Sequence, residues 1–248
     1  FVLGRKMAQE SKSKKSPGNP EFNRSDHRNL GRNATKSLRM KTSLAIPITK
    51  TSKSRIPETD FSNLVFGKVI SDHMFVADYK NGEWTDARIE PYAPLVLNPA
   101  NAALHYGQSI FEGLKAYKNE QGEILVFRAD ANARRMNESA ARMCMPAIPQ
   151  ELFLEGLRQL IDLDREWVPS AKGSSLYIRP YMFATDDYIG VKPSDTYKFI
   201  IFTCPVGSYY SKPVSVKVET EFTRATEGGT GAAKTAGNYA ASLYPALQ

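Results

Sequence analysis

Lys234 lies in a glycine-rich segment that runs from Gly228 to Tyr239 and has the sequence GGTGAAKTAGNY. A lysine between glycine-rich turns is poorly suited to packing a core, but its amine can reach a bound ligand through tight backbone. A neutral amine of this kind can form a Schiff base with a carbonyl cofactor and then carry a proton. Two alternatives stay open: a solvated loop lysine, and a phosphate-binding P-loop, although that pattern requires glycine where Ala233 stands.

Tyr177 and Arg179 are two residues apart in an apolar, strand-like run, so their side chains should project from the same face. Leu176, Ile178 and Met182 should take the other face. A tyrosine hydroxyl beside a guanidinium forms a receptor for a carboxylate. The alternative is an exposed strand face that carries a surface arginine.

Two further segments contain candidate ligand-binding residues. Arg134 and Arg135 are adjacent in a predicted helix; one of them could hold a phosphate bidentately, and otherwise both are solvated charges. The stretch from His105 to Gly113 alternates aromatic residues with glycines. The glycines allow close backbone approach, so the rings could line an apolar pocket or pack in the core.

The net charge of +7 comes entirely from one end of the chain. Residues 1–39 contain 10 basic and 3 acidic side chains, whereas the remainder contains 23 of each. The body therefore has no bias toward nucleic acid or an acidic membrane surface, and we expect neither partner. The chain has no run of 18 apolar residues, so a membrane span is not expected.

Cysteine and histidine usage excludes other classes of site. Cys144 and Cys204 are 60 residues apart among apolar neighbours, so we expect two buried free thiols in a reducing compartment. With only three histidines in the chain, we expect no metal site. We predict a cytoplasmic protein, or an organellar one if the basic tail is a transit peptide.

The elements that must position these side chains form a mixed α/β (α+β) pattern. Strands are predicted at 64–69, 74–79, 175–183, 197–204 and 214–222, and a β-hairpin at 114–118 and 123–128. One helix, capped by Asp130, should run to about Met143 with Ala133, Met136, Ala140 and Met143 on one face. A second should begin near Pro149 and bury Phe153, Leu157, Leu160 and Ile161. We predict a disordered tail over 1–39, an N-terminal α/β domain over 40–212 and the start of a C-terminal domain over 213–248.

The order of these motifs resembles that of the branched-chain amino-acid aminotransferases, fold-type IV enzymes that use pyridoxal 5′-phosphate. The resemblance covers about residues 56–248 and implies an N-terminal α/β domain followed by the first part of a C-terminal pseudo-barrel. The matching strings are LVFG at 64–67, DHM at 72–74, ALHYGQSIFEGLKAY at 103–117, FR at 127–128, RM at 135–136, WVP at 167–169, SLYIRP at 175–180, CPVGSY at 204–209, and Lys234 with GNY at 237–239.

The resemblance implies roles for individual residues. Lys234 corresponds to the lysine that joins the cofactor, and Arg135 to the arginine that grips its phosphate. Tyr177 and Arg179 correspond to receptors for substrate carboxylates, Arg179 for the distal carboxylate of glutamate. The remaining matches would line the substrate pocket: Phe66, Phe111, Gly113, Tyr209 and Tyr239. Of these, Tyr239 would also contact the cofactor.

Tyr106, Ile189 and Val191 match residues that the neighbouring subunit contributes in this family. The resemblance therefore implies a homodimer with shared active sites. The implied reaction is transamination between leucine, isoleucine or valine and 2-oxoglutarate, through a Lys234 Schiff base to pyridoxal phosphate. Its products are branched 2-oxo acids and L-glutamate. Chains of this family continue well beyond the position of Gln248, so we expect a fragment that is inactive alone.

Two other functions remain possible at this stage. A D-amino-acid aminotransferase or an aminodeoxychorismate lyase would share the fold, but the Tyr177–Arg179 pair and the FEG motif at 111–113 favour branched-chain substrates. A non-catalytic binding or regulatory protein that kept part of the fold is the alternative from a different class.

Overall fold

The computed structural model describes residues 44–208 and 213–248. The chain divides into residues 1–41 and residues 42–248, and the fold below is that of the second unit. The tail predicted over 1–39 lies outside the described residues. The boundary between 40–212 and 213–248 stays a prediction. In the described part of the chain, no helix is long and apolar enough to cross a membrane.

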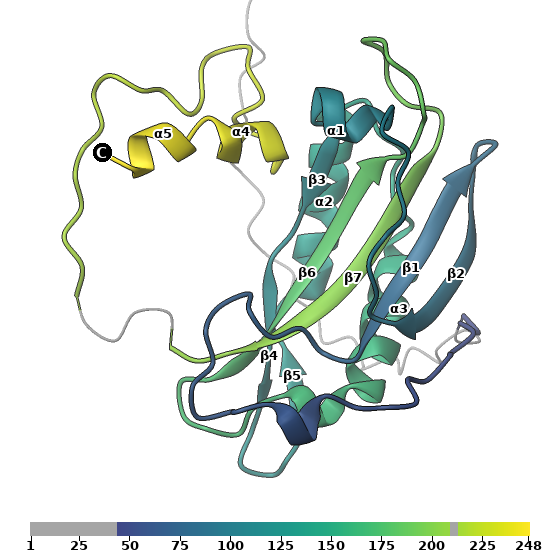
Figure 1. Ribbon diagram of the computed structural model, residues 1–248, viewed down its shortest axis with the longest axis vertical. Helices are drawn as coiled ribbons and strands as arrows, with labels where there is room; N and C mark the ends of the chain where they lie inside the picture. The colour runs from purple at the N-terminus through teal and green to yellow at the C-terminus, as the bar shows by residue number, and fades with distance from the viewer. Residues whose placement is uncertain (1–43, 209–212) are drawn as a thin grey trace, which may run out of the picture. The chain divides into compact units, whose positions relative to one another are not determined.

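A seven-stranded antiparallel sheet is the main element (Figure 1). Its strands lie in the order β2-β1-β7-β6-β4-β5, and β3 pairs with β6 on the same side as β4. Because every pairing between the named strands is antiparallel, the observed class is the α+β form of the predicted mixed pattern. The strands are β1 (His73–Lys80), β2 (Glu83–Pro91), β3 (Ser109–Phe111), β4 (Leu114–Lys118), β5 (Ile124–Val126), β6 (Ser175–Ala184) and β7 (Tyr197–Val206).

Two amphipathic helices, α2 (Ala129–Arg142) and α3 (Gln150–Leu163), cover one face of this sheet (Figure 1). Their apolar residues recur at helical spacing, so each helix buries one stripe against the strands. All predicted core residues of α3 are buried, and so are those of α2; only Met143, which follows the last residue of α2, remains partly exposed. The predicted helices and their buried faces are therefore confirmed.

Successive side chains of strand β6 point to opposite faces of the sheet, so one face of the strand belongs to the core and the other to the candidate site. Leu176, Ile178 and Met182 are fully buried on the helix-covered face. Tyr177 and Arg179 lie on the opposite face and remain partly exposed. Several shorter elements complete the described chain: η1 (Ile56–Glu58), α1 (Ala102–Tyr106), η2 (Arg165–Trp167), α4 (Ala236–Ala240) and α5 (Leu243–Ala246).

Most of the predicted strands are confirmed. Strand β1 ends at the expected Asn81–Gly82 turn, where both residues have positive φ, 54° and 83°, as a tight hairpin requires. The hairpin of β4 and β5 and the long strands β6 and β7 also occur where predicted. The sequence pattern missed β2 because this edge strand is polar and alternates weakly.

Two predicted strands are wrong. Residues 64–69 form turns, in which Gly67 adopts a φ of 72° and the Lys68 amide donates to the Val65 carbonyl. Residues 214–222 run without a strand partner among the described residues, and Val216 is 86% exposed. In both cases β-branched residues raised the strand propensity, but a strand also needs a neighbouring edge to pair with.

The predicted cap of α2 is also wrong. The helix begins two residues earlier than expected, at Ala129, after Arg128 in a left-handed conformation with φ 51°. Asp130 therefore lies inside the first turn, where its charge suits the helix dipole and pairs with Arg134 at 2.7 Å.

Candidate active site

A break between β3 and β4 creates the site. Both strands pair with β6, with Phe111 opposite Tyr181 and Leu114 opposite Ile178. Glu112 and Gly113 interrupt the ladder between them, and the Glu112 amide donates to the Pro180 carbonyl at 2.8 Å. This register brings the FEG motif beside Tyr177 and Arg179. Neither segment alone indicates that the two lie together.

Tyr177 and Arg179 form the predicted pair on one face of β6. Arg179 Nη2 donates to the Tyr177 hydroxyl at 3.0 Å, and the guanidinium carbon lies 4.4 Å from the centre of the Phe111 ring. The buried Nε of Arg179 has no hydrogen-bond partner among the described residues. Because a buried N–H without an acceptor is costly, this guanidinium is suited to an incoming anion.

Gly113 leaves the space that the Tyr177 ring occupies. A Cβ added at Gly113 would lie 2.4 Å from the Tyr177 hydroxyl oxygen. On its other side the Tyr177 ring makes an edge contact with Phe66, with ring centres 5.0 Å apart. Phe66, Gly113, Tyr177 and Arg179 are therefore contiguous, as the prediction of a shared pocket requires.

The Lys234 backbone is fixed between β3 and α2. Its amide donates to the buried Ser139 hydroxyl at 2.9 Å, and its carbonyl accepts from the Phe111 amide at 3.0 Å. The next residue, Thr235, bridges to Ile110 and donates its hydroxyl to the Ser109 carbonyl at 2.7 Å. The lysine is thus held by the strand that ends in Phe111.

The Lys234 amine lies among aromatic side chains. Its Nζ donates to the Tyr239 hydroxyl at 2.7 Å and lies 4.8 Å from the centre of the Phe111 ring. The rings of Phe111 and Tyr239 are themselves 4.8 Å apart. Phe111 therefore joins the Lys234–Tyr239 pair to the Tyr177–Arg179 pair through a continuous series of contacts.

The glycine-rich loop before Lys234 is ordered by two donors. Asn238, which is buried, donates its side-chain amide to the carbonyls of Thr230 and Ala233 at 2.9 and 2.7 Å. Arg142, at the end of α2, donates to the carbonyls of Gly228 and Gly229. These bonds satisfy loop carbonyls that have no secondary-structure partner.

Arg135 extends from α2 and pairs with a buried carboxylate. Its Nε and Nη2 donate to the two oxygens of Glu112 at 2.6 and 2.7 Å. The hydrogen bond to Glu112 raises the pKa of Arg135, and a smaller electrostatic contribution comes from Tyr239. Arg134, the neighbour of Arg135, is the exposed partner of Asp130.

These residues fit a cofactor with a carbonyl and a phosphate. Lys234 offers an amine beside a hydroxyl, and Arg135 retains three N–H groups with no partner among the described residues. The rings of Phe111 and Tyr239 beside the lysine could pack against a planar ring. No group of three or more histidine, cysteine or acidic side chains in the described ranges is arranged to hold a metal ion.

Three predicted residues lie away from this cluster. Tyr106 ends α1, whereas Ile189 and Val191 belong to the loop between β6 and β7, and all three are exposed. The two segments adjoin, because the Ala102 amide donates to the Asp186 carbonyl at 2.8 Å (Figure 1). All three side chains are exposed on these adjoining segments, and none of them lines the cavity beside Phe111 and Arg179. Tyr209 lies outside the described residues.

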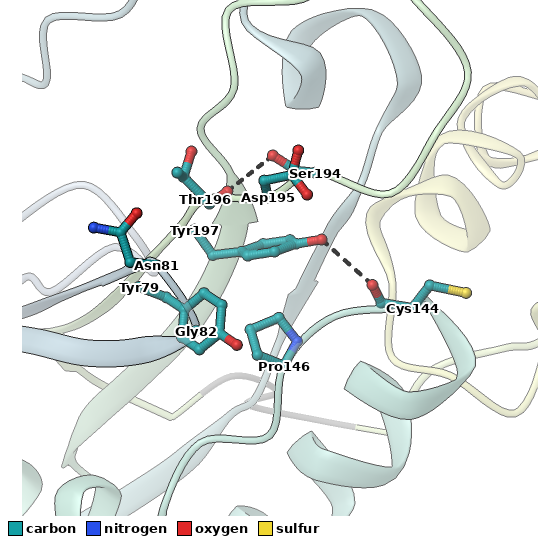
Figure 2. A pocket seen from close by; sticks show the side chains of 9 residues that line it. All are labelled: Tyr79, Asn81, Gly82, Cys144, Pro146, Ser194, Asp195, Thr196 and Tyr197. Carbon is teal, nitrogen blue, oxygen red and sulfur yellow. Dashed lines mark hydrogen bonds between the residues drawn. The ribbon is translucent and has the colours of Figure 1, made fainter.

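A shallow cavity of about 250 Å³ adjoins the cluster on the open face of the sheet, lined by Ser109, Ile110, Phe111, Arg179, Tyr181 and Phe202. A larger cavity, about 470 Å³, contains none of the predicted residues (Figure 2). In it the Tyr197 hydroxyl donates to the Cys144 carbonyl at 3.3 Å and so links β7 to the end of α2. Among the described residues, no lysine or arginine lines the larger cavity, so it offers neither an amine nor a guanidinium to a ligand.

One of the two predicted buried thiols is exposed. Cys204 is buried, and its burial raises the pKa of its thiol. Cys144 follows the last turn of α2 with a φ of 54° and is exposed despite its apolar neighbours in the sequence. Both thiols are free, as expected.

Sequence reasoning missed three supporting residues: Glu112, Ser139 and Asn238. Glu112 was visible only as a lone acidic residue in an otherwise apolar stretch, and that is the one signal that could have singled it out. Ser139 lies four residues after Arg135, on the same face of α2, but its partner is far away in sequence. Asn238 belongs to the recognised GNY string, yet nothing in that string indicates which carbonyls it holds.

Known proteins with related sequences and structures are aminotransferases. "Branched-chain-amino-acid aminotransferase 2" of Bacillus subtilis (strain 168) is 51% identical over 207 residues, which is 82% of this chain and 56% of the relative. The Escherichia coli branched-chain amino acid aminotransferase superposes with a TM-score of 0.53 at 28% identity, over 69% of this chain and 54% of that one. The branched-chain aminotransferase of Thermoproteus uzoniensis, at 19% identity and a TM-score of 0.55, shares the fold. No family model matches the chain.

The fold is therefore that of the fold-type IV enzymes. Within that class, the chain is related in sequence to the branched-chain-amino-acid aminotransferases, as its motifs indicated. The chain spans about half the length of the curated relatives it matches.

Proposed function

We propose that this chain carries the catalytic lysine and much of the substrate pocket of a branched-chain-amino-acid transaminase. The reaction exchanges the amino group of leucine, isoleucine or valine with the oxo group of 2-oxoglutarate, giving branched 2-oxo acids and L-glutamate. One observation carries the proposal: Lys234 Nζ lies 2.7 Å from the Tyr239 hydroxyl, at the end of an aromatic cluster that leads to Arg179. A relative that is 51% identical bears the name of this activity.

Pyridoxal 5′-phosphate is the proposed cofactor, and when bound it supplies a conjugated ring that stores the electrons released at the substrate Cα. Lys234 would hold the cofactor through its Nζ, and the same amine, once the substrate amino group has taken its place, would be free to take the proton from the substrate Cα and return it. The Tyr239 hydroxyl orients this amine by accepting one of its hydrogens. Arg135 holds the phosphate with the N–H groups that Glu112 leaves unused.

Arg179 and Tyr177 bind the substrate carboxylates. The buried Nε of Arg179 offers a donor for the distal carboxylate of glutamate or 2-oxoglutarate. Phe66 and Phe111 form apolar walls without a fixed negative charge, which suits an aliphatic side chain. One site would therefore accept both a branched apolar substrate and a dicarboxylate.

We also propose that the active enzyme is a homodimer. Tyr106, Ile189 and Val191 are 40%, 58% and 92% exposed and lie on adjoining segments, α1 and the loop after β6. An exposed apolar surface of this kind is typical of an interface. A second copy of the chain would receive these side chains at the open end of its own pocket.

The decisive experiment measures the visible absorption, with pyridoxal phosphate, of the purified protein prepared at the full length of its curated relatives, of which this chain spans about half. We expect the band of a lysine-bound cofactor, its loss on adding L-leucine and its return with 2-oxoglutarate. Lys234→Ala should abolish the band, whereas Lys217→Ala, at an exposed lysine, should leave it unchanged. A wild-type protein without the band, or a Lys234→Ala protein that keeps it, contradicts the assignment. D-Alanine in place of L-leucine tests the D-amino-acid alternative.

A further inference from the structure

Glu112 is a fully buried acidic residue to which the proposed reaction assigns no role. Its carboxylate accepts four hydrogen bonds: from Nε and Nη2 of Arg135 at 2.6 and 2.7 Å, from the Asn132 side chain at 2.8 Å, and from the Gly113 amide at 3.2 Å. A buried charge needs such a set of donors to be tolerated. The carboxylate is thus held rigidly between α2 and the break after β3.

The ion pair between Glu112 and Arg135 is bidentate, and its two side chains differ in their exposure to solvent. Two parallel N–H···O bonds fix the plane of the guanidinium, which a single contact would leave free to rotate. Glu112 is buried, whereas the Arg135 side chain is 54% exposed. The buried carboxylate therefore occupies one edge of the guanidinium and leaves both hydrogens of Nη1 and one of Nη2 directed away from it.

The same helix face connects this pair to the lysine. Asn132, Arg135 and Ser139 recur at helical spacing on α2. Asn132 and Arg135 hold Glu112, whereas Ser139 holds the Lys234 amide. Arg135 and Lys234 are consequently fixed to one rigid element, at a separation that the helix sets.

We propose that Glu112 is a positioning residue that orients the Arg135 guanidinium to bind the phosphate monoester of the cofactor. This inference rests on the proposed function, since it assumes that Lys234 binds a phosphorylated carbonyl compound. The ion pair has no net charge, so Arg135 attracts the phosphate mainly through directed N–H groups. Without the carboxylate, a long arginine side chain must lose rotamer freedom on binding, which weakens the complex.

The test compares pyridoxal phosphate with pyridoxal, which lacks the phosphate. The measured quantity is the dissociation constant of pyridoxal divided by that of pyridoxal phosphate, each determined from the lysine-bound absorption band. This ratio isolates what the phosphate contributes to binding. In Glu112→Gln we expect this ratio to fall about tenfold, because the amide turns an N–H toward the Arg135 donors and displaces them. Asp130→Asn, which breaks the exposed carboxylate–arginine pair on the same helix, should leave the ratio unchanged.

A double-mutant cycle separates positioning from general support of the fold. In an Arg135→Gln background, Glu112→Gln should change the ratio no further. Glu112→Gln also removes a negative charge, which by itself would strengthen the attraction of the phosphate to the site. The measurement is therefore repeated at about 0.5 M salt, where screening weakens this effect. If Glu112→Gln does not fold, Asn132→Ala, which removes one donor to the carboxylate, should lower the ratio in the same direction.

The possible outcomes are distinct. An unchanged ratio in both Glu112→Gln and Asn132→Ala overturns the inference and leaves the proposed function intact. A loss of affinity that is equal for pyridoxal and pyridoxal phosphate also overturns it, since it would mean that Glu112 only supports the fold. Absence of the band in the wild-type protein with either compound overturns the proposed function and, with it, the inference.

Discussion

Replacement of Gly113 by alanine tests how the pocket is built. The added Cβ would lie 2.4 Å from the Tyr177 hydroxyl oxygen, whereas ordinary contacts begin at 3.4 Å. The ring must therefore shift by roughly 1 Å, enough to stretch the 3.0 Å hydrogen bond from Arg179 beyond a bonding distance. Losing a hydrogen bond to a charged group costs about 1.5–3 kcal/mol, and a weakened edge contact with Phe66 adds up to about 1 kcal/mol.

We expect Gly113→Ala to lower the free energy of unfolding by about 2–3 kcal/mol, measured by urea denaturation followed by tryptophan fluorescence. Gly207→Ala is the matched control, because its added Cβ would meet its nearest atom, the Leu64 carbonyl oxygen, at 3.6 Å. Alanine reduces the entropy of the unfolded chain equally in both variants, so the difference between them isolates the clash.

The Tyr177→Phe background removes the atom that clashes. The remaining ring carbons would lie 3.1 and 3.3 Å from the added Cβ, so only tenths of an ångström of movement are needed. In this background Gly113→Ala should cost less than about 1 kcal/mol. Equal stability of Gly113→Ala and Gly207→Ala, or a cost that Tyr177→Phe does not reduce, would refute the reasoning.

Two further predictions concern groups outside the pocket. A thiol reagent at neutral pH should modify one cysteine per folded chain, because Cys204 is buried and the pKa of its thiol is raised. Cys144→Ser should abolish this reaction, and rapid modification of both thiols would contradict the prediction. Burial raises the pKa of Tyr181 from 10.0 to about 12, so its contribution to stability is fully present below pH 10 and is lost as the pH rises through about 12. Alkaline unfolding in this range should be less steep in Tyr181→Phe than in the wild type, and identical pH profiles would argue against a buried hydroxyl.

Local patterns in the sequence were sufficient for the elements that carry regular periodicity. The apolar spacing of α3 and the alternation along β6 each follow from one segment, because burial on one face imposes a fixed period. The Asn81–Gly82 turn was equally local. The same rules failed for 64–69 and 214–222, since a strand is stabilised by a partner that the segment itself does not contain.

The sequence by itself determined the resemblance to the branched-chain aminotransferases and the candidate residues, because motifs such as SLYIRP and HYGQSIFEGLKAY are specific in combination. Only the tertiary structure decided which of these residues meet. The break at Glu112 and Gly113 sets the register that joins Phe111 to Arg179, and Ser139 anchors Lys234 across 95 positions of chain. The separation of Tyr106, Ile189 and Val191 from the pocket was also decided at this level. The physical reason is that pairing register and burial of single polar groups depend on contacts between distant segments, which leave no periodic trace in the chain.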